Sequence, residues 1–157
     1  MWFIYLIYLI YLILCGFLAT LVHEYCHVGM AQILVGVDQF SVKPFIHRHK
    51  DLGLVGGSVS ITYKRLRTKS EEAWIAFAPR FSNALFLILL PFTVDKGSLV
   101  IVLVATLGCY DMIRGSLPND CDCKTYCSHW GVSPYLVRYY QLTLSYVSFL
   151  LFLLRLS

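Results

Sequence analysis

The pattern of apolar and polar positions divides the chain into long apolar runs separated by polar stretches. The first run, residues 2 to about 35, is uniformly apolar and ends at Gly36, which predicts one helix long enough to cross a bilayer. Three later runs predict further spans over residues 71–93, 99–114 and 134–154. The expected fold class is therefore a membrane all-α protein with about four transmembrane helices.

Residues 37–63, between the first two predicted helices, have a different pattern. Residues 37–43 and 57–63 alternate apolar and polar positions with the period of two that is typical of strands. A polar turn and the pair Gly56-Gly57 separate the two segments. We therefore expect a small β-hairpin at the cytoplasmic face of the membrane, between the first two helices.

Composition and charge indicate one membrane domain over residues 1–157. The chain is 58% hydrophobic, above the roughly 45–50% of soluble proteins, and its mean hydropathy is +0.67. Seven of its thirteen Lys and Arg residues lie from Lys43 to Lys69, and the positive-inside rule places this loop in the cytoplasm. We expect an integral, multi-pass protein in contact with the lipid bilayer. We expect no nucleic-acid partner, because the sequence has no basic stripe.

One motif in the first predicted helix carries the candidate chemistry, a His-Glu-x-x-His sequence over residues 23–27. Residues four apart share a helix face, so His23 and His27 can direct both imidazoles at one metal ion. Glu24 lies beside this pair and can take the proton of a metal-bound water. Burying these three polar groups inside an apolar run is costly, and a zinc site for hydrolysis within the membrane would explain it.

A third metal ligand is expected from elsewhere in the chain, because catalytic zinc usually has three protein ligands and a water. Asp111, Asp120 and Asp122 lie at or just beyond the inner end of the third predicted span. A carboxylate there would offset the charge of the metal. His47 and His49 belong to a basic surface loop and are poorer candidates.

Two other features have open interpretations. Cys121, Cys123 and Cys127 cluster with His129, either as free thiols or as a second metal or redox site. Pro79 interrupts the second predicted span and is tolerated there if neighbours satisfy the backbone carbonyl that it frees.

These motifs, in this order, resemble the site-2 protease family of intramembrane zinc metalloproteases. That family has a His-Glu-x-x-His motif in its first core span and then a Gly-Val segment before a β-rich stretch, to which Gly36-Val37 is similar. Residues 78–83, Ala-Pro-Arg-Phe-Ser-Asn, look like a variant of its Gly-Pro-x-x-Asn signature. Asn83 would then contact substrate, or alternatively make a helix-packing hydrogen bond.

The last motif of the family supplies the third ligand. Residues 116–122 keep its Leu-Pro and an acid, but they lack its glycine and have a shorter spacing. On this resemblance we rank Asp120 first, Asp122 second and Asp111 third.

The resemblance implies that the protein uses zinc to hydrolyse peptide bonds of transmembrane protein substrates, with Glu24 as the base and the active site toward the cytoplasm. Two alternatives remain. The chain could be a metalloprotease-like membrane scaffold that has lost hydrolysis, or a metal-dependent membrane hydrolase acting on a lipid-linked or terminal peptide.

Overall fold

The computed structural model describes residues 2–45, 47–49, 53–55, 57–93 and 121–156. Its helices are α1 (Trp2–Leu34), α2 (Lys69–Thr93), α4 (Cys121–Trp130) and α5 (Pro134–Leu156). Its strands are β1 (Val37–Lys43), β2 (His47–His49), β3 (Gly53–Val55) and β4 (Ser58–Tyr63).

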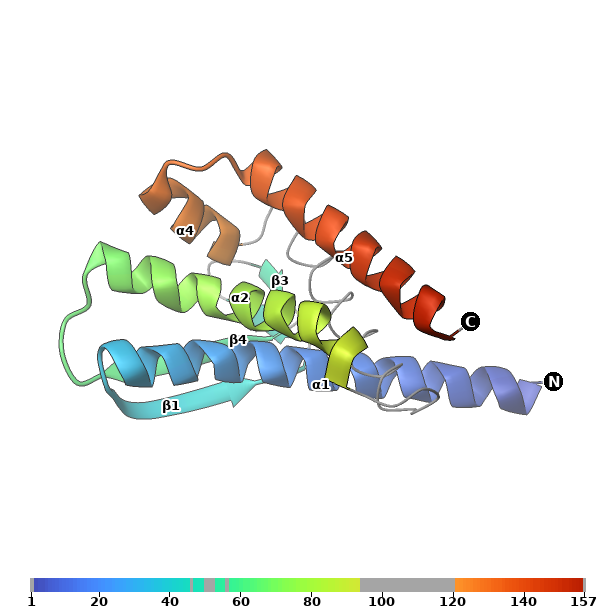
Figure 1. Ribbon diagram of the computed structural model, residues 1–157. Helices are drawn as coiled ribbons and strands as arrows, with labels where there is room; N and C mark the ends of the chain where they lie inside the picture. The colour runs from blue at the N-terminus through green and yellow to red at the C-terminus, as the bar shows by residue number, and fades with distance from the viewer. Residues whose placement is uncertain (1, 46, 50–52, 56, 94–120, 157) are drawn as a thin grey trace.

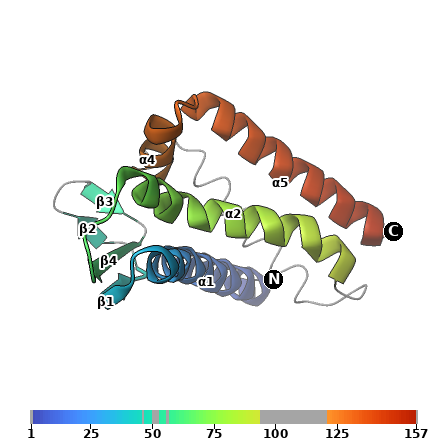
Figure 2. The same cartoon turned by 60° about the vertical axis from the view of Figure 1, so that its left-hand side comes forward.

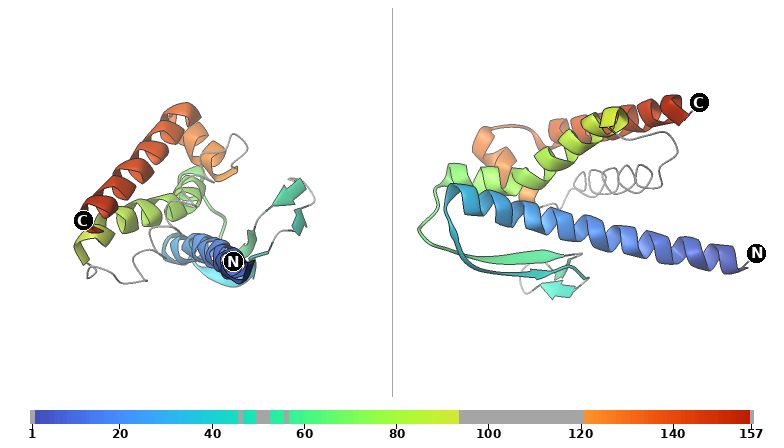
Figure 3. Two further views of the ribbon diagram at one scale, coloured as in Figure 1. Left: turned by 90° about the vertical axis from the view of Figure 1, so that its right-hand side faces the viewer. Right: turned by 60° about the horizontal axis from the view of Figure 1, so that its bottom comes forward.

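The described elements are arranged in layers around α1 and α2. Strands β1 and β4 lie along the C-terminal half of α1, and α2 packs on another side of α1 (Figures 1 and 2). Helix α2 also contacts α4 and α5, so it is the central helix of the described part. The N-terminal end of α1 and the C-terminal end of α5 lie toward the same end of the molecule (Figure 3).

Helix α1 ends where Gly36 adopts a positive φ of 81°. Glycine takes this left-handed conformation without the steric penalty of a side chain. The backbone N–H groups of Val35 and Gly36 both donate to the carbonyl of Ala31, at 2.9 and 3.0 Å. The next N–H, that of Val37, donates to the Gln32 side-chain oxygen at 2.8 Å. These bonds let the chain turn directly from the helix into β1.

The predicted strands over 37–43 and 57–63 are confirmed, because β1 and β4 pair antiparallel from Val37 opposite Tyr63 to Lys43 opposite Ser58. We call this pair the ribbon. The register shifts between Val37 and Gln39. A second antiparallel pair, β2 with β3, lies in the segment that joins the two strands of the ribbon.

Two apolar clusters hold the described helices together. One lies between α2 and α4 and consists of Ala73, Ala76, Cys123, Tyr126 and Cys127, with Phe77 and Trp130 packed against it. The other joins α1, α2 and the ribbon and consists of Ala31, Val35 and Ile75, with Ile61 and Tyr63 packed against it. Small residues in both clusters let α2 approach its neighbours closely.

The prediction of four transmembrane spans is wrong. Among the described helices, α1 alone is long and apolar enough to cross a membrane, over Tyr5–Leu34. Helix α2 has two acidic residues in its first turn and buries Arg80 and Asn83, and α5 buries Gln141 and two serines. These polar residues interrupt the apolar pattern of both helices. The third predicted span, 99–114, lies outside the described residues.

Candidate metal centre

Three polar side chains from two helices converge between α1 and α4. His23 and His27 lie on one face of α1 and are 2% and 7% exposed. Their Nε2 atoms are 3.3 Å apart. One carboxylate oxygen of Asp122, Oδ2, lies 3.2 Å from each of these two nitrogens. Three potential ligand atoms therefore form a nearly equilateral triangle.

The size of this triangle suits a small metal ion. Ligand atoms about 2.0–2.1 Å from a tetrahedral zinc are separated from each other by about 3.3 Å. The three observed separations, 3.2, 3.2 and 3.3 Å, are close to this value. Among the described residues, His23, His27 and Asp122 form a group of three side chains that could hold a metal ion.

Helix α4 carries Asp122 to the two histidines. Asp122 lies in the first turn of α4, where the helix dipole favours a negative charge. The buried side chains of Cys123, Tyr126 and Cys127 fix α4 against α2. Burial raises the pKa of Asp122, but hydrogen bonds with His23 and His27 and the charges of these rings outweigh it and hold the pKa well below its usual range. This low pKa favours the ionised carboxylate, which is the form that binds metals.

The ring of His27 is oriented by α2. Its Nδ1 lies 2.7 Å from the backbone carbonyl oxygen of Ile75. Metal-binding histidines commonly donate their second ring N–H to such an acceptor, which fixes the orientation of the ring. The Nε2 atom of His27 is then the one directed at Asp122 and His23.

Glu24 directly follows His23 in α1 and lies under the segment that leads into β4. Its side chain is only 4% exposed. Gly57, just before β4, runs so close to this part of α1 that an added Cβ would overlap Cγ2 of Thr20 and lie 3.2 Å from Oε1 of Glu24. The backbone just before β4 therefore covers α1 at Glu24, and this approach requires a glycine.

The other predicted site residues are distributed differently. Asn83 is buried on α2, and Asp111 and Asp120 lie outside the described residues. Cys123 and Cys127 are free thiols whose sulfur atoms lie 3.6 Å apart in the cluster between α2 and α4. His129 is exposed. The two thiols therefore contact each other inside the packed contact between α2 and α4.

Sequence reasoning missed two backbone contributions to the centre, the carbonyl of Ile75 and the close approach of Gly57. Each had a signal in the sequence. Pro79 lies four residues after Ile75 and therefore frees its carbonyl, and Gly57 belongs to a glycine pair that was interpreted only as a turn.

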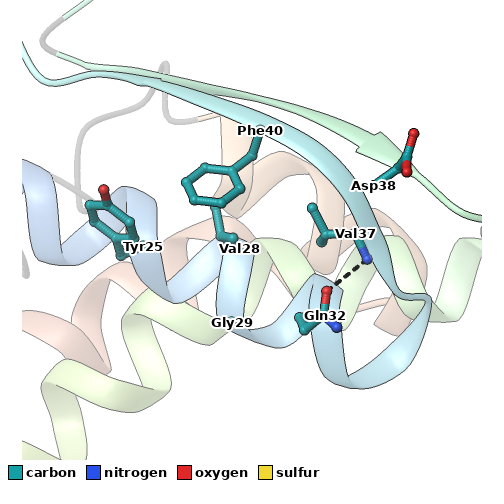
Figure 4. A pocket seen from close by; sticks show the side chains of 7 residues that line it. All are labelled: Tyr25, Val28, Gly29, Gln32, Val37, Asp38 and Phe40. Carbon is teal, nitrogen blue, oxygen red and sulfur yellow. Dashed lines mark hydrogen bonds between the residues drawn. The ribbon is translucent and has the colours of Figure 1, made fainter.

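A separate hollow of about 360 Å³ lies between α1 and β1. It is lined by Tyr25, Val28, Gly29 and Gln32 of α1 and by Val37, Asp38 and Phe40 of β1 (Figure 4). None of the three residues of the triangle lines it. We therefore assign the candidate chemistry to the triangle and not to this hollow.

Comparison with known proteins gives no match to a protein-family model, to a curated protein or to a solved structure.

Proposed function

We propose that the protein is a zinc-dependent peptidase that acts on membrane-embedded substrates, with His23, His27 and Asp122 as the metal ligands. One observation carries the proposal. Nitrogen and oxygen atoms of three side chains, two of them histidines four apart on one helix, converge with the separations expected of tetrahedral zinc ligands.

The donor set favours a catalytic zinc. Two imidazoles and one carboxylate are borderline ligands that suit zinc, and three protein ligands leave a fourth position for water or substrate. When bound, zinc would polarise the scissile carbonyl and lower the pKa of a coordinated water from 15.7 to about 7. The carboxylate of Asp122 reduces the net charge that must be buried with the ion.

Glu24 is the proposed general base. It follows His23 directly in α1, and its burial keeps bulk water from its carboxylate. In this role Glu24 accepts a proton from the attacking water and returns it to the leaving amine. Asn83, buried on the neighbouring helix α2, is the proposed contact for a substrate strand.

The proposed substrate class follows from α1. The residues of the triangle on α1 lie within Tyr5–Leu34, the segment that is long and apolar enough to cross a membrane. Soluble peptides would not reach such a site, whereas a membrane-embedded segment would. An α-helical substrate must unwind locally, because its internal hydrogen bonds otherwise shield the scissile carbonyl. The basic loop after α1 supports an active site toward the cytoplasmic side.

Metal analysis of the purified protein tests the ligands. We expect about one zinc per chain in the wild type and a large loss of zinc in His23→Ala and Asp122→Ala. Asp38→Ala is the matched control, because Asp38 is an exposed carboxylate of β1 outside the triangle. Equal zinc content in Asp122→Ala and Asp38→Ala would remove Asp122 from the site.

Hydrolysis is tested in liposomes that contain the protein and labelled transmembrane peptides. We expect cleavage that a zinc chelator abolishes and added zinc restores. Bound zinc without cleavage of any such peptide would instead support the scaffold alternative. Cleavage confined to lipid-linked or terminal peptides would support the other hydrolase.

A further inference from the structure

Pro79 lies in the interior of α2, and its side chain is fully buried. Proline has no backbone N–H, so the carbonyl four residues earlier lacks its usual partner within the helix. That carbonyl belongs to Ile75, and it is the atom that lies 2.7 Å from Nδ1 of His27. The proline and the histidine bond therefore involve the same carbonyl.

The freed carbonyl of Ile75 affects the metal centre through its hydrogen bond with the ring of His27. A histidine that binds a metal through Nε2 carries its remaining proton on Nδ1, and this N–H needs an acceptor when the ring is buried. The Ile75 carbonyl provides that acceptor. Directing the N–H at a fixed carbonyl sets the rotation of the ring and so aims Nε2 at Asp122 and His23.

The packing of α1 on α2 fixes the distance over which this bond acts. Ile75 packs against Ala31 and Val35, which follow His27 at intervals of four residues on α1. Ala31 is fully buried and presents only a methyl group to α2. The two helix backbones can therefore come close enough for a side chain of α1 to reach a carbonyl of α2.

We propose that Pro79 is a positioning residue of the metal centre, because it withholds an N–H from the Ile75 carbonyl and reserves that carbonyl for His27. This inference rests on the proposed metal-binding function of His27. A carbonyl oxygen has two lone pairs, so an N–H at position 79 would compete with His27 rather than displace it completely. Restoring that N–H should weaken the hydrogen bond between His27 and the Ile75 carbonyl. The His27 ring should then be more mobile, and the metal affinity should be lower.

The test is Pro79→Ala, with Pro91→Ala as the matched control. Pro91 also lies in α2, so both substitutions restore one backbone N–H to the same helix. Zinc affinity is measured by competition with a chelator. We expect Pro79→Ala to bind zinc about 10- to 100-fold more weakly, as is typical when an outer hydrogen bond of a metal ligand is lost. Pro91→Ala should bind zinc as the wild type does.

A second measurement reports the hydrogen bond itself and needs no metal. The carbonyl carbon of Ile75 is labelled with ¹³C, and its chemical shift is recorded in metal-free protein with and without His27→Phe. We expect His27→Phe to move the signal in the wild type, and to move it less when Pro79→Ala supplies a competing donor. Thermal unfolding of each variant shows that it is folded.

The outcomes separate this inference from the proposed function. A wild type that binds no zinc overturns the proposed function, while the carbonyl shift still tests the link from Pro79 to His27. Wild-type zinc affinity in folded Pro79→Ala overturns the inference and leaves the function intact. If Pro79→Ala does not fold, the inference is tested by the Ile75 carbonyl shift with Pro79 in place. A shift that does not change on His27→Phe means that the hydrogen bond is absent, which overturns the inference.

Discussion

At the residue scale, the histidines and Glu24 of α1 are polar groups in an apolar helix, and each carries a desolvation cost. Mutual contacts offset part of this cost. His23 and His27 both contact Asp122, and His27 also contacts the Ile75 carbonyl. Two imidazole nitrogens and a carboxylate oxygen within 3.3 Å of one another concentrate electron pairs at one point. A metal cation could bind all three atoms at once.

Glu24→Gln tests the assignment of the base. The amide has nearly the size of the carboxylate but cannot accept a proton at neutral pH. We expect the variant to keep its zinc content and to lose most hydrolysis, by roughly 100-fold or more, as expected for removal of a general base. Zinc content and initial cleavage rates are measured on the same preparation. Substantial cleavage by a zinc-loaded variant would assign the base to another group.

Gly57→Ala tests the close approach of the ribbon to α1. The new methyl group would overlap Cγ2 of Thr20, and overpacking of this kind costs about 1–3 kcal/mol. We expect a lower unfolding free energy, measured by chemical denaturation. Thr20→Ser removes Cγ2 and keeps the hydroxyl that donates to the Gly16 carbonyl. The double variant should therefore recover most of the loss, and simple addition of the two single effects would refute this packing.

The sequence predicts the histidine pair and Glu24 because a helix places them on adjoining positions, which depends on local geometry alone. It could not choose among the aspartates by the same reasoning. Asp122 meets the histidines because α4 begins at Cys121 and packs on α2 through residues of its next turns. That contact depends on tertiary packing between residues about a hundred positions apart, which a local pattern does not encode.

At the element scale, the junction between α1 and α2 is held by a capping box. The Thr68 hydroxyl accepts from the Glu71 N–H at 3.3 Å, and the Glu71 carboxylate accepts from the Thr68 N–H at 2.8 Å. Arg65 donates to both carboxylate oxygens of Glu71 and to the carbonyl of Leu34 at the end of α1. One arginine thus links the last turn of α1 to the first turn of α2, the two helices joined by the contact of His27 with the Ile75 carbonyl.

The capping box predicts a specific dependence of stability on pH. Hydrogen bonds from Arg65 and from the Thr68 backbone lower the pKa of Glu71 from 4.5 to about 2. Because the pKa is lower in the folded state, the ionised carboxylate stabilises the fold above pH 4.5, and this contribution disappears as the pH falls toward 2. Glu71→Gln should therefore lower the melting temperature at neutral pH, with a difference that shrinks between pH 4.5 and 2.

Arg65→Ala is the partner variant for this measurement. It should also lower the melting temperature. The part of this effect that comes from Glu71 should shrink over the same pH range, because the arginine is the main cause of the lowered pKa of Glu71, whereas the part from the bond to Leu34 should persist. A difference between Glu71→Gln and wild type that persists unchanged at the acid end would mean that the charge of Glu71 does not contribute.

Elements were predictable where the local pattern decides them. The strands of the ribbon follow from alternation and the end of α1 from Gly36. The number of spans was not predictable from apolar content. Some apolar residues of the predicted spans instead form the clusters that join α2 to α1 and α4. Only the three-dimensional structure separates these two uses of apolar side chains.

At the scale of the whole molecule, α1 has two halves with different surroundings. The C-terminal half packs against the ribbon and α2 on part of its surface, and it carries the candidate metal centre. The N-terminal half extends beyond the ribbon and α2 (Figures 1 and 3). Large apolar side chains such as Trp2, Phe3 and Ile13 are exposed there. Contact of these apolar side chains with water is unfavourable, whereas a lipid environment would accommodate them.

A pair of charge substitutions tests whether α1 crosses a membrane. Ile13 and Ile33 are both exposed residues of α1, at 62% and 78%, so neither substitution disturbs the packed part. Ile13→Arg puts a charge within the span, which costs about 2.5–3.5 kcal/mol near its centre. Ile33→Arg puts the same charge near the helix end, where a long side chain can reach the interface.

We expect Ile13→Arg to lower the fraction of protein that stays with membranes after an alkaline wash, and Ile33→Arg to leave that fraction near the wild-type value. Because the two variants have the same composition and net charge, a difference between them reports the depth of each position and not general solubility. Equal retention of both variants would mean that α1 does not span the bilayer. The metal centre would then lie in a water-accessible protein, and soluble peptides would become the substrates to test first.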